Sequence, residues 1–296
     1  MAETGLTMTS DIQVEQRRKD FVTSFAKNWK ALTDIMGVRQ PIKKEPGTVL
    51  KSYKATLTLE DGNVGEGEKI PLSKATITEV AHADLTIKKY GKAITIEDVD
   101  KYGPDVAIEM TDDAFRNELL NEVLSEFYEF ALTGTLKPEG ATDFQMGVAL
   151  AIGAVKNKFA TMRLDGSRVV VFVNTMDAYQ YLGAAQLSVQ NVFGINYVKN
   201  FLGAETMFFA GDNDIPRGTI VAIPVDNMKD YYADPSNSGF ARMALRYTVD
   251  SILPMLGFAV EGDYSTATGN NWAIMGHKLW AEYLDAIAVV TVAPGA

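Results

Sequence analysis

The chain has 296 residues and a formal net charge of −10, with a sequence pI of about 4.8, which excludes binding to nucleic acid by bulk charge attraction. It contains no cysteine, which excludes disulfides, thiolate metal ligands and thiol nucleophiles. Apolar residues make up 47% of the chain, and no apolar run approaches the roughly 20 residues that cross a bilayer. We therefore expect a soluble globular protein with no membrane partner.

The first expected element is an amphipathic helix over residues 11–36. Gly37 is a stop signal for this helix, and Pro41 and Pro46 favour an extended chain after it. Such an order indicates an arm rather than a core element. The apolar side chains of the helix recur at steps of three or four residues and so share one face: Phe21, Phe25, Trp29, Leu32 and Met36.

From Lys54 onward the hydrophobic period changes to two, which is typical of strands. Residues 55–59 and 75–80 alternate in this way, and the polar, glycine-rich stretch 61–73 lies between them. The pattern predicts a long hairpin. An isolated two-stranded hairpin is marginal in water, so its apolar face needs a surface to lie on. Short apolar segments at 85–88 and 94–96 predict two more strands.

The clearest helix is expected from Pro104 to Leu132, because proline suits a first helical turn and Gly134 suits the position after the end. One apolar stripe follows it at four-residue spacing: Phe115, Leu119, Val123, Phe127 and Ala131. A second stripe is acidic: Glu118, Glu122, Glu126 and Glu129. Like charges four residues apart repel each other, so we expect a basic partner along that face.

The second half of the chain predicts a compact alternation of helices and strands. Asn174 is a capping residue for a helix from Thr175 to Leu182, supported by Asp177 in the first turn. Further strands are expected at the end of the chain. The other expected elements are a helix at 146–159 and strands at 168–173, 206–209, 219–223, 243–249 and 279–292.

Three local patterns resemble ligand-binding or metal-binding motifs, and each is better explained as an ordinary structural feature. The glycines of 62–67 lie between strands rather than before a helix, which favours a loop tip over a phosphate site. His82 and His277 have no ligand partners nearby in sequence, so each is expected at the surface or in an interface. The acidic stretch 212–214 lacks the later ligands of a calcium loop and indicates a turn. We therefore predict no catalytic, cofactor-binding or metal-binding residues.

The order of arm, long hairpin, very long helix and α+β body resembles the Hong Kong 97-type major capsid proteins of tailed bacteriophages. The local sequences Val-Val-Val-Phe-Val-Asn at 169–174 and Arg-Gly-Thr-Ile-Val-Ala-Ile-Pro-Val-Asp at 217–226 are similar to recurrent phrases of their axial domain. The resemblance implies an N-terminal arm at 1–53, an extended E-loop at 54–80, a peripheral domain at 81–144 with a spine helix at about 104–132, an axial domain at 145–260, and return strands of the peripheral domain at 261–296.

The resemblance also implies a structural role with no enzymatic activity. In this family, subunits form pentamers and hexamers that close into an icosahedral shell around double-stranded DNA. The expected partners are further copies of the chain, with scaffolding, portal and decoration proteins. The expected location is the virion capsid, assembled in the cytoplasm of the host bacterium. No cofactor is expected.

Contacts between subunits are expected at two sets of residues. The arm residues Phe21, Phe25 and Trp29 should pack on the subunits of the shell, because such an apolar face is unfavourable in water. The extended loop of one subunit crosses the next subunit near its spine helix in this family. We therefore expect Lys69 and Lys74 to approach the stripe Glu118, Glu122, Glu126 and Glu129 of an adjacent chain.

Two other functions remain open at this stage. An encapsulin-like compartment shares this fold and encloses protein cargo instead of DNA, so the contents of the shell separate the two. A cytosolic enzyme that binds a small molecule would need a concave polar site, and the sequence nominates no residues for one.

Overall fold

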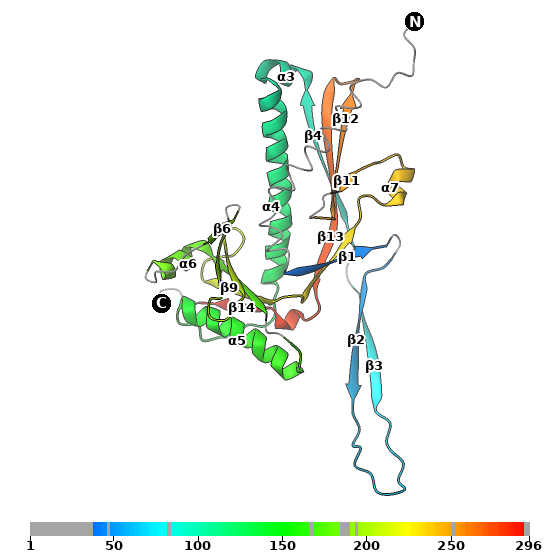
Figure 1. Cartoon of the computed structure of the whole chain (residues 1–296), viewed down its shortest axis with the longest axis vertical. Coiled ribbons are helices and arrows are strands. Elements are labelled where there is room, and N and C mark those ends of the chain that lie inside the picture. Colours follow the sequence, from blue (N-terminus) through cyan, green and yellow to red (C-terminus); the bar gives the residue numbers. More distant parts are fainter. Residues whose placement is uncertain are drawn as a thin grey trace.

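The computed structural model describes residues 38–45, 48–81, 84–165, 168–183, 190–192, 195–249 and 253–292. The expected amphipathic helix at 11–36 lies outside these residues, as do its side chains Phe21, Phe25 and Trp29. The described part is a mixed α+β structure, as the sequence predicts. It is elongated, with a long helix along one sheet, a second sheet beside one end of that helix, and a projecting hairpin (Figure 1).

A six-stranded sheet forms one side of the molecule. Its order is β1-β10-β13-β12-β11, and β4 pairs with β13 outside this path. The β1–β10 pair is parallel and the other pairs are antiparallel. Strand β13 organises the sheet, since its first part pairs with β12 and β4 and its last part pairs with β10. The bounds are β1 Arg39–Lys44, β4 Ile87–Thr95, β10 Met228–Ala233, β11 Thr248–Val249, β12 Leu256–Asp263 and β13 Thr268–Ala281.

The spine helix lies along this sheet (Figure 1). A short helix α3, Ile96–Tyr102, leads into a π-helical turn at Asp105–Met110 and then α4, Thr111–Leu132. The predicted helix from Pro104 to Leu132 is thereby confirmed. Its predicted apolar stripe is the buried face: Leu119, Val123, Phe127 and Ala131 are at most 2% exposed, and Phe115 is partly buried against the same core.

The second sheet has the order β14-β9-β5-β8-β7-β6. Both of its faces are covered, which explains why β5 is a continuous apolar run rather than an alternating one. Val170 and Phe172 face the core shared with α4, while Val171 faces the core shared with α5 and α6. The bounds are α5 Phe144–Met162, β5 Val169–Asn174, α6 Thr175–Leu182, β6 Gln190–Val192, β7 Ile195–Lys199, β8 Thr206–Ala210, β9 Thr219–Pro224 and β14 Ala288–Thr291.

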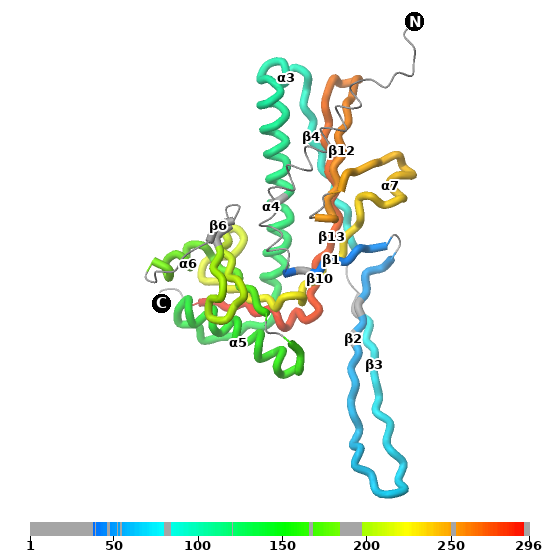
Figure 2. Tube along the Cα trace, in the orientation of Figure 1, coloured from blue at the N-terminus to red at the C-terminus, as the bar shows by residue number. Residues whose placement is uncertain are grey.

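The hairpin extends away from the rest of the described structure (Figures 1 and 2). Strand β2, Lys51–Thr58, pairs antiparallel with β3, Lys74–Ala81, and these two strands form a sheet of their own. Residues 59–73 connect them. This matches the hairpin that the sequence predicts at 54–80.

The sheets divide the chain differently from the boundaries drawn on the sequence. Strands β10, β11 and β12 fall within the range 145–260, yet they belong to the first sheet, beside the spine helix. Residues 261–296 were expected to be return strands of the peripheral domain, and of these β14 pairs with β9 in the second sheet. The short apolar strand Ala288–Thr291 can satisfy either sheet, so its partner cannot be assigned from its own residues.

Two smaller expectations are also corrected. Residues 94–96 are not a separate strand: β4 ends at Thr95, whose side chain accepts a hydrogen bond from the backbone N–H of Asp98 and starts α3. The range 243–249 contains only the two-residue strand β11, and a short helix α7, Ser238–Arg242, precedes it. Among the described helices, none is both long and apolar enough to span a membrane.

Candidate assembly surfaces

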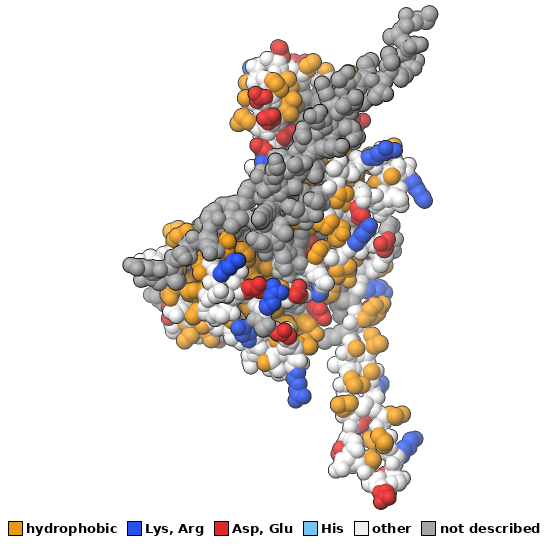
Figure 3. Space-filling model, viewed as in Figure 1, with side chains coloured by type: hydrophobic (Ala, Val, Ile, Leu, Met, Phe, Trp, Pro, Cys, Tyr) orange, Lys and Arg blue, Asp and Glu red, His pale blue; other side chains and the backbone are white. Residues whose placement is uncertain are grey.

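The hairpin exposes an unusual amount of apolar surface for a segment that pairs only with itself. Leu59 is 77% exposed and Leu72 is 87% exposed. Burying such area is worth about 25 cal/mol per Å², so a neighbouring molecule that covered it would gain substantially. Figure 3 shows hydrophobic side chains along the projecting hairpin. Its exposed large apolar side chains are Tyr53, Leu57, Leu59, Ile70, Leu72 and Ile77.

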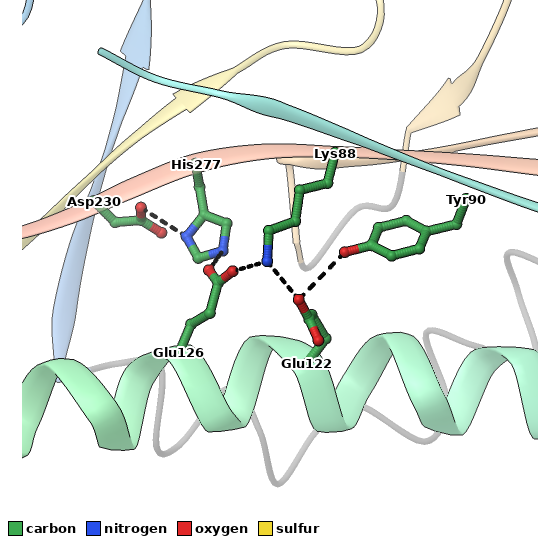
Figure 4. Close-up of polar contacts among 6 residues, drawn as sticks. All are labelled: Lys88, Tyr90, Glu122, Glu126, Asp230 and His277. Atoms are coloured by element: carbon green, nitrogen blue, oxygen red, sulfur yellow. Dashed lines mark hydrogen bonds and ion pairs between the residues drawn. The ribbon is translucent and has the colours of Figure 1, made fainter. Parts of the chain in front are cut away.

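The acidic stripe of the spine helix has a basic partner within the same chain. Lys88 on β4 binds both Glu122 and Glu126 on α4, and the hydroxyl of Tyr90 lies 3.5 Å from Glu122 Oε1. These side chains meet in the space between the sheet and the helix (Figure 4). The basic partner expected from the spacing of the glutamates is thus present for two of them.

A second ion pair follows from the same geometry. The side chains of residues 88, 90 and 92 all point toward the helix, because every second side chain of a strand lies on the same face. Lys92 binds Asp112 and donates to Thr111 Oγ1 at 2.8 Å. Four strand residues cover about 13 Å, and the ten residues from Asp112 to Glu122 cover about 15 Å of helix. The two lysines therefore hold β4 in antiparallel alignment along α4.

His277 extends this charged cluster into the interior. It lies on β13, where its side chain is 3% exposed. Its Nδ1 is 3.2 Å from Oδ1 of Asp230, a fully buried carboxylate on β10, and its Nε2 is 2.9 Å from Oε2 of Glu126 (Figure 4). The expectation of a surface or interface histidine is wrong for His277 within the subunit, because odd-numbered residues of β13 face the helix. His82 lies outside the described residues.

The cluster changes the ionisation of its members. Partial burial by itself raises the pKa of Glu126, but the contacts with His277 and Lys88 outweigh burial and hold the pKa at about 2. Burial also opposes the charge of Lys88, and here Glu122 and Glu126 prevail and raise the pKa of the lysine above its ordinary value. Charged groups that stabilise one another in this way fix the register of helix and sheet.

The depressed pKa of Glu126 predicts a loss of stability in acid. A carboxylate with a lower pKa in the folded state stabilises the fold fully above its unfolded value of about 4.5, and the contribution disappears as pH falls toward 2. Glu126→Gln should therefore unfold more easily than wild type above this window, and the difference should shrink within it. Urea unfolding at several pH values measures this. Glu129→Gln is the matched control, and a pH-independent difference for Glu126→Gln would contradict the prediction.

The remaining residues predicted for contacts between subunits lie at the surface. Glu118 and Glu129 are exposed on α4, and Lys69 and Lys74 are exposed on the hairpin. Glu122 and Glu126 already bind Lys88, so Glu118 and Glu129 are the members of the stripe without a partner among the described residues. The approach of Lys69 and Lys74 to the stripe of an adjacent chain stays a prediction.

Sequence reasoning did not identify Lys88, Asp230 and His277 as one cluster. The signal was present in part, since Lys88, Tyr90 and Lys92 alternate on one face of a strand that precedes an acidic helix. Asp230 and His277 belong to strands far apart in sequence and could not be joined without the fold. Within the described ranges, no group of three or more His, Asp or Glu side chains could hold a metal ion.

Comparison with known proteins gives a structural likeness alone. No family model matches the sequence, and no curated protein matches it. The fold is similar to a chain of the bacteriophage PhiM1 mature capsid, with a TM-score of 0.56, 10% identity, and coverage of 88% of this chain and 87% of that one. It is also similar to a chain of the cyanophage A-1(L) capsid, with a TM-score of 0.53, 13% identity, and coverage of 88% and 92%.

A chain from Mycobacterium phage Che8 has a TM-score of 0.50 at 10% identity and covers 81% of this chain and 84% of its own. The likeness thus extends over most of each chain. At such low identity the comparison establishes the fold. The chain adopts the Hong Kong 97-type fold found in phage capsids.

Proposed function

We propose that this chain is the major capsid protein of a tailed bacteriophage, which assembles through pentamers and hexamers into an icosahedral shell. The observation that carries the proposal is the hairpin, whose six large apolar side chains are 57–87% exposed in the described part of the chain. A projecting apolar hairpin gains stability only against another molecule, and repeated copies of one chain supply that molecule at every position of a closed shell.

The role is structural, and the enclosed material is double-stranded DNA held without sequence-specific contacts. The acidic character of the chain supports enclosure rather than tight binding, because a net charge of −10 repels phosphate. Scaffolding, portal and decoration proteins are the further partners in this proposal, and the host cytoplasm is the place of assembly. The proposal also includes packing of Phe21, Phe25 and Trp29 on the subunits of the shell.

Expression of the full chain, alone and with its scaffolding protein, tests the proposal. We expect shells, tubes or capsomer rings in negative-stain electron microscopy and a matching early peak in size-exclusion chromatography. A variant with Leu59→Ser and Leu72→Ser should keep the wild-type circular dichroism spectrum yet remain in small species, because these side chains are 77% and 87% exposed in the described structure. A stable monomer across micromolar concentrations in all salt conditions would refute the proposal.

The contents of purified particles separate this function from the encapsulin-like alternative. Nuclease-resistant double-stranded DNA in particles from infected cells is the result expected here. A defined protein cargo without DNA would instead establish a compartment of the encapsulin kind.

A further inference from the structure

The tip of the hairpin, residues 57–72, is both apolar and acidic. It carries Leu57, Leu59, Ile70 and Leu72 at exposures of 57–87%. Four carboxylates and one lysine accompany them: Glu60, Asp61, Glu66, Glu68 and Lys69. A surface that receives this tip must therefore offer apolar area together with positive charge.

One other surface of the described structure has these two properties. The α7 knob, defined as residues 238–247, stands out from the first sheet, and residues 241–246 are all exposed. Met243 is 69% and Leu245 42% exposed. The knob contains Arg242 and Arg246 and no carboxylate, and within the described ranges neither guanidinium has an acidic partner. Figure 3 shows basic side chains in the region where Figure 1 places α7.

The α7 knob is built as a firm surface. The backbone N–H of Leu245 donates to the carbonyl of Phe240 at 3.0 Å, and the rings of Phe240 and Tyr247 meet edge to face at 6.3 Å. Its last residue packs on β12, where a Cβ at Gly257 would lie 2.9 Å from Cβ of Tyr247. A rigid patch loses little conformational entropy when a partner binds.

Another exposed apolar region has the wrong charge for the hairpin tip. At the start of the spine helix, Ile96, Tyr102, Val106 and Met110 are 47–64% exposed. Exposed carboxylates surround them: Glu97, Asp98, Asp100, Asp105 and Glu109. Like charges across an interface oppose binding, so this region repels the tip whereas the α7 knob attracts it.

The contact has to join two copies of the chain. In one subunit the hairpin points away from α7, with β1 between them (Figures 1 and 2). We propose that the hairpin tip of one copy docks on the α7 knob of a second copy, with the leucines of the tip against Met243 and Leu245 and the tip carboxylates beside Arg242 and Arg246. This inference rests on the proposed function and names the contact that links neighbouring subunits; it is the alternative to an approach of Lys69 to the acidic stripe of an adjacent chain.

Cysteine cross-linking tests the contact directly, because the native chain has no cysteine. Leu72→Cys combined with Met243→Cys should give a ladder of covalent oligomers on non-reducing gels after mild oxidation of assembled particles, since each copy links head to tail with the next. Each single variant can give at most dimers. The matched control pairs Leu72→Cys with Met110→Cys, which is equally exposed but lies on the acidic region of the spine helix. A ladder from the control alone would overturn the proposal.

Charge reversal provides a second, independent test. Arg242→Glu with Arg246→Glu should raise the protein concentration needed for assembly by about tenfold, whereas Arg242→Lys with Arg246→Lys should assemble nearly as wild type. Adding Glu60→Lys and Glu66→Lys, whose carboxylates make no hydrogen bond within the described structure, should restore assembly of the first variant. Circular dichroism confirms that each subunit is folded.

The outcomes separate this contact from the proposed function. Wild-type shells together with normal assembly of the reversed variant and no ladder would refute the contact and leave the shell function intact. A wild-type chain that forms no assembly would refute the function itself.

Discussion

Replacing Phe127 with alanine should lower the free energy of unfolding by about 3–5 kcal/mol, the cost of removing a large aromatic side chain from a closed core. Phe127 is fully buried on α4. Its ring meets Phe172 of the second sheet edge to face at 5.3 Å and Tyr128 at 5.6 Å. Because the spine helix touches both sheets here, the cavity would weaken the junction between them. Urea unfolding followed by circular dichroism, with both proteins in the same assembly state, measures the change.

Tyr102→Ala is the matched control for this variant. Tyr102 lies on α3, near the exposed start of the spine helix, and is 54% exposed. Its loss should change the free energy of unfolding by less than about 0.5 kcal/mol. Equal destabilisation by the two substitutions would show that Phe127 does not occupy the core position assigned to it.

The parts of the fold that could be predicted are those determined by neighbouring residues. Phe127 was placed on the buried stripe because a four-residue period is a local property of helices. Helix α6 was predicted with its bounds and its cap, and Asn174 does accept a hydrogen bond from the backbone N–H of Met176. The hairpin was predicted because alternation and a glycine-rich connection are also local.

The parts that could not be predicted depend on pairing between distant segments. Strand β14 joins the second sheet rather than the first, since its four residues suit either one. Ile96 was predicted to lie in a strand, although Thr95 followed three residues later by Asp98 is a helix-start pattern. In that case the signal was present, and the apolar Ile94 and Ile96 on either side obscured it.

In the candidate surfaces, too, local features could be predicted from the sequence and contacts between distant segments could not. The exposed apolar hairpin could be anticipated, because a two-stranded segment has no room to bury its own face. The acidic stripe was identified, but the distribution of its charges was not: Lys88 neutralises Glu122 and Glu126 only because β4 lies antiparallel to α4. His277 was expected at the surface, since nothing near it in sequence indicates that Asp230 lies opposite.

His277→Leu should be the second strongly destabilising substitution, with an expected loss of about 3–5 kcal/mol in the free energy of unfolding. The imidazole lies between the buried carboxylate of Asp230 and that of Glu126, and leucine removes a partner from both. A buried carboxylate that loses one of its partners has less to offset its cost of desolvation. Lys278→Ala is the matched control, because Lys278 is the next residue of β13 and its side chain is exposed on the other face.

A double variant distinguishes lost charge pairing from lost packing. His277→Leu with Asp230→Leu removes both members of this contact and fills the space with apolar side chains beside Leu279, the cross-strand neighbour of Asp230. Replacing a buried ion pair by apolar residues is often close to neutral, so the double variant should recover most of the stability lost in His277→Leu, while Glu126 keeps Lys88 as its partner. Urea unfolding of the three proteins at one pH provides the comparison. If the double variant were less stable than His277→Leu, Asp230 would stabilise the fold through contacts other than the one with His277, and lost pairing would not explain the effect of His277→Leu.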